Sequence, residues 1–122
     1  MQITKEQQTR GKKEKKPKKK TKTQLNKVKD TEWSAMVKIL AGNRCEVCGT
    51  TQFLNSHHIF GRGNHSTRWD VNNGVCLCAG HHKFKHDFSA HNTPTLFTEW
   101  VILKRGKEWH DLLTLKAKGI LK

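Results

Sequence analysis

The sequence has no long apolar run, no internal repeat and few acidic residues. No stretch approaches the roughly 18 apolar residues that a membrane-spanning helix requires, so we expect no membrane partner or span. The positive charge near the N-terminus is not followed by an apolar segment, which argues against a secretory signal. The sequence therefore predicts a protein that is not secreted.

The scarcity of acidic residues leaves a large positive charge. The 122 residues contain 24 Lys and Arg against ten Asp and Glu, for a net charge of +14 and a pI near 10.0. Lys and Arg side chains that neutralise phosphates release counterions and so drive binding to nucleic acid. Nucleic acid is therefore the first candidate partner, ahead of an anionic membrane surface.

The basic residues are concentrated at the start of the chain. Residues 1–30 carry twelve of the 24 basic residues and three of the ten acidic ones. We predict that residues 1–29 form a disordered basic arm, because they are too polar to bury apolar area. Lys18, Lys19 and Lys20 would then contact DNA phosphates, although a purely solubilising tail fits the same composition. Residues 30–122 are left for one folded domain, near the size at which a metal often supplements the core.

Apolar spacing predicts helices at both ends of this domain and extended chain between them. A first helix should begin at Asp30 or Thr31 and end near Ala41, with one apolar face formed by Trp33, Met36, Val37 and Leu40. Residues 52–60 look extended, and an Asn-Gly turn at 73–74 leads into a strand that ends at Cys78. Further helices are predicted at 79–91, from 94 to about 106, and at about 107–118. The pattern indicates a small α+β fold.

The most informative stretch is 45–86, which holds all four cysteines and six of the eight histidines. Nothing indicates export, so these cysteines are interpreted as metal ligands and not as disulfides. Cys45 and Cys48 form a Cys-x2-Cys knuckle, and Cys78 and His81 repeat its spacing. Together the two pairs could complete a closed tetrahedral zinc site that contributes folding energy. Cys76 could instead pair with Cys78, and the sequence does not exclude that choice.

A second group of histidines suggests chemistry. His57 and His58 are adjacent in an extended segment, so their side chains should point to opposite faces. One imidazole could then hold a metal ion while the other takes a proton, since its ordinary pKa is about 6.5. His82 and His86 are spaced i, i+4 and could close on the same ion if the segment is helical.

These residues, in this order, resemble the HNH family of nucleases, which share the ββα-metal fold. The resemblance covers 45–86 and implies a ββα-metal motif at about 45–91, a zinc knuckle, and packing helices at about 94–118. It implies that His57 and His82 bind a catalytic divalent ion such as Mg, Mn, Ni or Zn, and that His86 is a further ligand of this ion or a phosphate contact. It further implies that His58 is the general base and that Asn73 fixes the adjoining loop. The chain departs from many zinc-bearing relatives at His81, where they have cysteine, and His81 and His82 could exchange roles.

The polar loop and the C-terminal segment are similar to small phage-encoded HNH proteins, including the NinG-type recombination nucleases. Arg62 and Arg68 flank this loop, and their guanidinium groups suit phosphate contacts. The implied function is a metal-dependent endonuclease on double-stranded or branched DNA, with no cofactor beyond metals, acting in phage or mobile-element DNA processing in the host cytoplasm. A non-catalytic zinc-containing DNA-binding module is the main alternative, and an RNA-binding zinc protein is a third.

Overall fold

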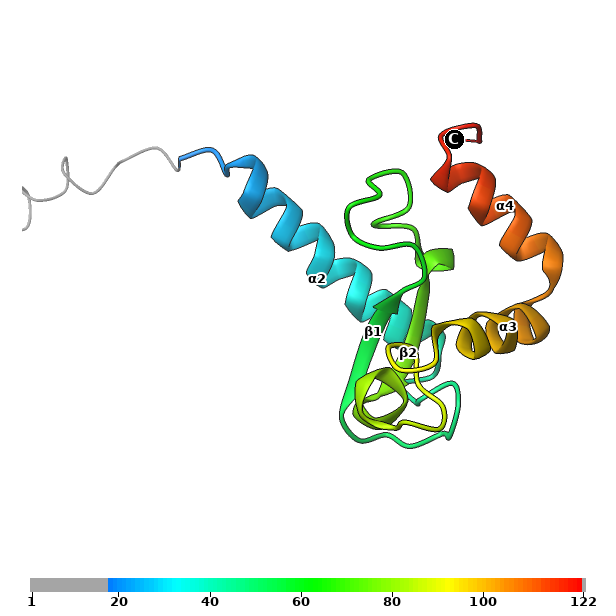
Figure 1. Cartoon of the computed structure of the whole chain (residues 1–122). Coiled ribbons are helices and arrows are strands. Elements are labelled where there is room, and N and C mark those ends of the chain that lie inside the picture. The colour runs from blue at the N-terminus through cyan, green and yellow to red at the C-terminus, as the bar shows by residue number, and fades with distance from the viewer. Residues whose placement is uncertain (1–17, 122) are drawn as a thin grey trace, which may run out of the picture.

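The computed structural model describes residues 18–121, and within them the chain forms a small α+β fold. Helix α2 (Lys22–Leu40) leads to strands β1 (Leu54–His58) and β2 (Gly74–Cys78). The short helix η1 (Val71–Asn73) precedes β2, and the π-helical turn η2 (Gly80–Phe84) follows it. Helices α3 (Pro94–Arg105) and α4 (Lys107–Ala117) complete the described fold. Figure 1 shows α2 reaching away from the strands at its N-terminal end.

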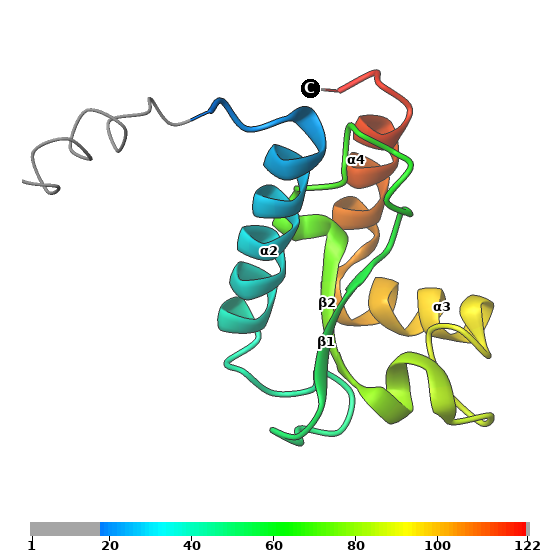
Figure 2. The same cartoon turned by 90° about the vertical axis from the view of Figure 1, so that its left-hand side faces the viewer.

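The two strands form an antiparallel sheet with helices on both sides (Figure 2). Leu54 pairs with Cys78 at one end of the sheet and His58 with Gly74 at the other. Alternate residues of a strand point to opposite faces, so β2 supplies two small cores. The first core joins β2 to α2, and its buried members are Trp33, Val37 and Cys76. The second core joins β2 to α3, and its main buried members are Val75, Leu77, Phe97 and Val101.

Gly74 allows β2 to approach α2 closely. A Cβ atom at this position would overlap the Val37 side chain and would lie 2.9 Å from the Trp33 ring. The backbone of Gly74 is extended, at φ −117° and ψ 145°, so space and not conformational freedom requires glycine here. Gly74 therefore sets how closely α2 approaches β2, at the end of the sheet where Gly74 pairs with His58.

Helix α2 begins earlier than the sequence predicted, which corrects the boundary of the disordered arm at residue 29. Thr21 caps the helix: its hydroxyl accepts from the Gln24 N–H at 3.2 Å, and the Gln24 side chain accepts from the Thr21 N–H at 2.8 Å. Once a helix is nucleated by packing at Trp33, extending it by single residues costs little. Residues 1–17 of the predicted arm lie outside the described part of the chain. The predicted apolar face is also narrower, because Met36 and Leu40 are exposed.

The helix predicted at 79–91 is wrong beyond Phe84. Lys85 is extended, at φ −76° and ψ 125°, and its N–H group bonds to the Gly80 carbonyl at 2.8 Å, which closes a π-type turn. The Asn92 amide then donates to the Lys83 and Lys85 carbonyls at 2.6 and 3.1 Å, which satisfies the groups that the ended helix leaves free.

The two C-terminal helices are confirmed close to their predicted bounds. Thr93 and Pro94 lie at the start of α3, as expected for a proline in a first helical turn. Gly106, at φ 95°, separates α3 from α4. Within residues 18–121, no helix combines the length and the apolar character that crossing a membrane requires.

Candidate metal centres

Four side chains predicted as zinc ligands come together beside the start of η2. Cys45, Cys48, Cys78 and His81 place their ligand atoms within 4.8 Å of one another. The Cys48 and Cys78 Sγ atoms are 3.8 Å apart, and His81 Nδ1 lies 3.2 Å from Cys78 Sγ and 3.9 Å from Cys45 Sγ. A tetrahedral zinc ion with ordinary Zn–S and Zn–N bonds would require ligand separations of roughly 3.5–3.8 Å. The cluster could therefore hold a metal ion such as zinc.

The backbone of the knuckle presents the first two thiols. The Gly49 N–H donates to the Cys45 carbonyl at 2.8 Å, and the Cys45 N–H donates to the Thr50 carbonyl at 2.8 Å. Gly49 has φ 76°, a conformation that favours glycine and closes the turn after Cys48. Burial opposes ionisation of the Cys45 thiol, but backbone N–H groups outweigh it and lower its pKa. Cys45 is thus already disposed to be a thiolate ligand.

Cys76 lies apart from this cluster, which resolves the alternative left open by the sequence. Its side chain is fully buried with Trp33 and Val37 in the core beneath α2. Burial, followed by the nearby Glu46 carboxylate, raises the pKa of Cys76 to about 11. A thiol in that state is neutral and serves as a small packing residue.

A second cluster is made of three histidines. His57, His82 and His91 place one ring nitrogen each within 4.8 Å of the others. The ring centroids are 5.2 Å apart for His57 and His82 and 4.6 Å apart for His82 and His91, and the two Nε2 atoms of the latter pair are 3.2 Å apart. The edge of Phe97 packs against His57 with centroids 5.5 Å apart. Three convergent imidazoles could hold a divalent ion with positions left open.

The third histidine that the structure brings to this cluster is His91, and not the predicted His86. The chain turns at Lys85, so His86 does not follow His82 on a continuing helix and is exposed. The His91 N–H bonds to the His82 carbonyl at 3.0 Å, which brings the two residues side by side. His82 and His91 are not related by a helical or strand spacing, so the sequence does not predict that the chain brings them together.

Burial keeps two of the clustered histidines, His57 and His82, uncharged. It lowers the pKa of His57 to about 3, with repulsion from His82 and His91 adding to the effect. Burial also lowers the pKa of His82 to about 4, and repulsion from His91 lowers it in the same direction. Neutral imidazole is the form that binds metals, so His57 and His82 are ready to bind an ion at neutral pH.

His58 lies on the other face of β1, as the alternation of the strand predicts. Its ring stacks on Trp33 with centroids 3.7 Å apart and an interplanar angle of 10°. His58 Nε2 is 2.9 Å from the Arg68 carbonyl oxygen, which can only accept, so Nε2 carries the proton and Nδ1 is left with a lone pair. Burial lowers the pKa of His58 despite the opposing effect of that carbonyl. The ring is therefore held in one orientation and one neutral tautomer.

Asn73 is fully buried and ties together both ends of the polar loop. Its Oδ1 accepts from the Phe60 N–H at 2.7 Å, and its Nδ2 donates to the Phe60 and Thr67 carbonyls at 2.9 and 3.1 Å. The Asn73 carbonyl also accepts from the Ile59 N–H at 2.9 Å. Asn73 thereby fixes the loop that carries the Arg68 carbonyl to His58.

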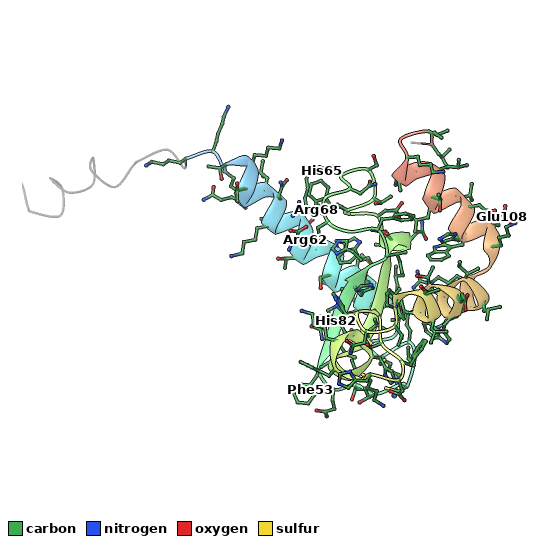
Figure 3. All side chains as sticks on the ribbon, in the orientation of Figure 1. Phe53, Arg62, His65, Arg68, His82 and Glu108 are labelled. Carbon is green, nitrogen blue, oxygen red and sulfur yellow. The ribbon has the colours of Figure 1, made fainter. Side chains whose placement is uncertain are left out.

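Asp30 anchors the same loop to α2, a role that the sequence did not predict. Arg68 donates to its carboxylate through Nε and Nη2 at 2.9 and 2.7 Å, Trp69 donates at 2.9 Å, and Arg62 donates at 3.0 Å. Figure 3 shows Arg62 and Arg68 beside α2. Arg68 is largely covered by this pairing, so its predicted role as a free phosphate ligand is corrected to a structural one. Arg62 keeps 64% of its side chain exposed and is still accessible to a phosphate.

The remaining predicted DNA contacts, Lys18, Lys19 and Lys20, are exposed ahead of α2. No family model, curated protein or solved structure matches this chain.

Proposed function

We propose that this chain is a metal-dependent DNA endonuclease with an HNH-type site. The observation that carries the proposal is the pairing of two features on neighbouring residues of β1. His57 belongs to a cluster of three convergent imidazoles, and the His58 imidazole is neutral and held in place with Nδ1 able to accept a proton. A divalent metal site beside a general base is the combination that hydrolysis of a phosphodiester requires.

The residues suited to hold the ion are His57, His82 and His91. Their nitrogens converge within 4.8 Å, and His57 and His82 are neutral, so binding an ion displaces no proton from either of these two. When bound there, a divalent ion would polarise the scissile phosphate and stabilise the charge that develops on the leaving oxygen. A set of three imidazoles suits Mn, Co, Ni or Zn better than Mg, which prefers oxygen ligands.

His58 would take the proton from the attacking water through Nδ1. Its Nε2–H stays on the Arg68 carbonyl, which orients the ring and stabilises the imidazolium that forms. The Trp33 ring, stacked on His58, restricts rotation of the imidazole and excludes water from one of its faces. Asn73 and Asp30 act as positioning residues, because each fixes the backbone that carries residue 68.

The Cys45, Cys48, Cys78 and His81 cluster would serve as a closed structural zinc site. All four ligands come from the protein, so no position is left for substrate. DNA is the proposed substrate because the chain carries a net charge of +14, and Arg62 and Lys18 to Lys20 present exposed cations.

A cleavage assay tests the proposal. Linear, supercoiled and branched DNA would be incubated with the full chain and with Mg, Mn, Ni or Zn, beside His58→Ala loaded with the same metal. We expect cleavage by the native chain with at least one ion, and a loss of about 100-fold or more in His58→Ala, in line with the contribution of a general base. Cleavage unchanged in His58→Ala would refute the mechanism, whereas binding without cleavage under every condition would favour a zinc-containing DNA-binding module.

A further inference from the structure

Two phenylalanines are exposed near the end of the sheet where η2 begins. Phe84, the last residue of η2, has 72% of its surface exposed, and Phe53, just before β1, has 79% exposed. Most of the surface of each residue is left in water, so packing accounts for little of either ring. A function that uses the aromatic ring itself would account for both residues.

The backbone at Phe53 strengthens this argument. Phe53 has φ 52°, in the left-handed region that bulky side chains rarely adopt. The Asn55 side chain donates to the Phe53 carbonyl at 3.2 Å and helps to hold the turn. Glycine would fit this turn with less strain, so the strained position presents an aromatic ring to solvent at a conformational cost.

Phe84 is near the proposed metal centre in the chain, and Phe53 lies at the end of the sheet where η2 begins. Phe84 comes two residues after His82, a member of the three-histidine cluster. Phe53 directly precedes Leu54, which pairs with Cys78 at the end of the sheet where η2 begins. Figure 3 shows Phe53 and His82 toward the same end of the molecule, away from the loop that carries Arg62 and Arg68.

The charges around Phe84 identify the kind of ligand. Lys83 and Lys85 flank it directly, and both are exposed. An exposed aromatic residue with a lysine on each side of it in the sequence matches a nucleotide, whose base stacks on the ring while its phosphates meet the lysines. Bases within a duplex are already stacked on their neighbours, so a ring at the surface can reach only a base that is unpaired.

We propose that Phe84, assisted by Phe53, stacks on unpaired bases of a DNA strand that enters the proposed nuclease site. This inference rests on the proposed function and specifies its substrate: DNA with a single-stranded segment next to the bond that is cut. Lys83 and Lys85 would hold the phosphates on either side of the stacked base.

Binding measurements with two matched ligands test the inference. One ligand is a blunt duplex, and the other is the same duplex with a single-stranded tail; phosphorothioate linkages prevent cleavage in both. Phe84→Ala should weaken binding to the tailed duplex by about fivefold or more, while binding to the blunt duplex changes by less than about twofold. Phe84→Tyr should restore the affinity because it keeps the ring. Leu103→Ala removes an equally exposed apolar side chain from α3 and should have no effect on either ligand.

A second readout uses the unaltered full chain. A 5-iodouracil placed in the single-stranded tail should cross-link on irradiation to Phe84 or Phe53, as located by mass spectrometry. Equal losses on both ligands, failure of tyrosine to rescue, or cross-links confined to other residues would overturn the inference. Neither readout depends on catalysis: stacking without cleavage would refute only the proposed nuclease, and cleavage without stacking would refute only this inference.

Discussion

At the scale of single residues, His58 makes cleavage depend on pH. Burial lowers its pKa below the ordinary 6.5, and the base acts only when neutral. We therefore expect the single-turnover cleavage rate to be constant above pH 6.5 and to fall at a lower pH, as the ring becomes protonated. His57 and His82, with pKa values of about 3 and about 4, stay neutral through this window, so protonation of these two ligands does not cause the fall.

The pH profile contradicts this assignment in either of two cases. The first is a rate that is already falling above pH 7 with metal content unchanged, because a lowered pKa cannot produce it. The second is a rate that falls only when bound metal is lost, which would leave His58 without a role as base. Metal content measured at each pH separates the two effects.

Asp30 should stabilise the fold through its ion pair with Arg68, which is lost in acid. The Arg68 guanidinium holds the pKa of this carboxyl at about 2, below its ordinary 3.8. The stabilisation is therefore present above pH 3.8 and is lost as pH falls through about 2. We expect Asp30→Asn to lower the free energy of unfolding by about 1–2 kcal/mol at neutral pH, allowing for partial solvent screening.

Urea unfolding of the native chain and Asp30→Asn measures this difference at neutral pH and near pH 2. The gap should narrow at the lower pH, because native Asp30 is then partly protonated. Asp111→Asn, which alters an exposed carboxyl on α4, is the matched control and should have little effect at either pH. A gap that is the same at both pH values would contradict the ion-pair account.

At the scale of secondary structure, Gly74 should govern the contact between β2 and α2. Gly74→Ala places a methyl group against Val37 and Trp33, and overpacking of this kind costs about 1–3 kcal/mol. Gly61→Ala is the control, because nothing lies within 4 Å of its added Cβ atom. Chemical denaturation of both variants measures the effect, and equal stability of the two would show that the helix does not approach the strand this closely.

Metal binding at the cysteine cluster should depend on Cys78 and not on Cys76, although both belong to β2. Cys78→Ser removes a ligand and should abolish the thiolate-to-metal absorption of the cobalt-substituted protein. Cys76→Ala should keep that absorption, at a stability cost of about 1 kcal/mol for the small cavity. Loss of the absorption in Cys76→Ala, in a chain that still folds, would reassign the ligand set.

The sequence predicted those features that depend on local spacing. The ligand pair of Cys78 and His81, the opposite faces of His57 and His58, and the helix starting at Pro94 all follow from fixed periodicities of strands and turns. His91 and Asp30 could not be found in this way. His91 reaches His82 only because the chain turns at Lys85 and returns, and such a tertiary contact leaves no periodic signal.

At the scale of the whole molecule, α2 connects the basic start of the described chain to the site. Trp33 and Asp30 lie one turn apart on α2; Trp33 stacks on His58, and Asp30 holds Arg68. The exposed Lys18, Lys19 and Lys20 precede this helix. DNA bound along these lysines would be led toward the residues that α2 positions.

Salt dependence tests this long-range arrangement. Replacing Lys18, Lys19 and Lys20 with Gln should reduce the slope of the logarithm of the binding constant against the logarithm of salt concentration by up to about 2.7 for duplex DNA. The effect on binding should be similar for unrelated DNA sequences, because phosphate contacts carry no base information. An unchanged slope would show that these lysines only improve solubility.

The most direct test of the central claim, that His57, His82 and His91 form the catalytic metal centre, compares two histidine variants. His91→Ala should lose manganese affinity and at least about 100-fold of the single-turnover cleavage rate, while His86→Ala should keep both within about twofold. Both variants should retain the cobalt absorption of the cysteine cluster, which reports a folded chain. The opposite outcome, with His86→Ala inactive and His91→Ala unaffected, would contradict the account.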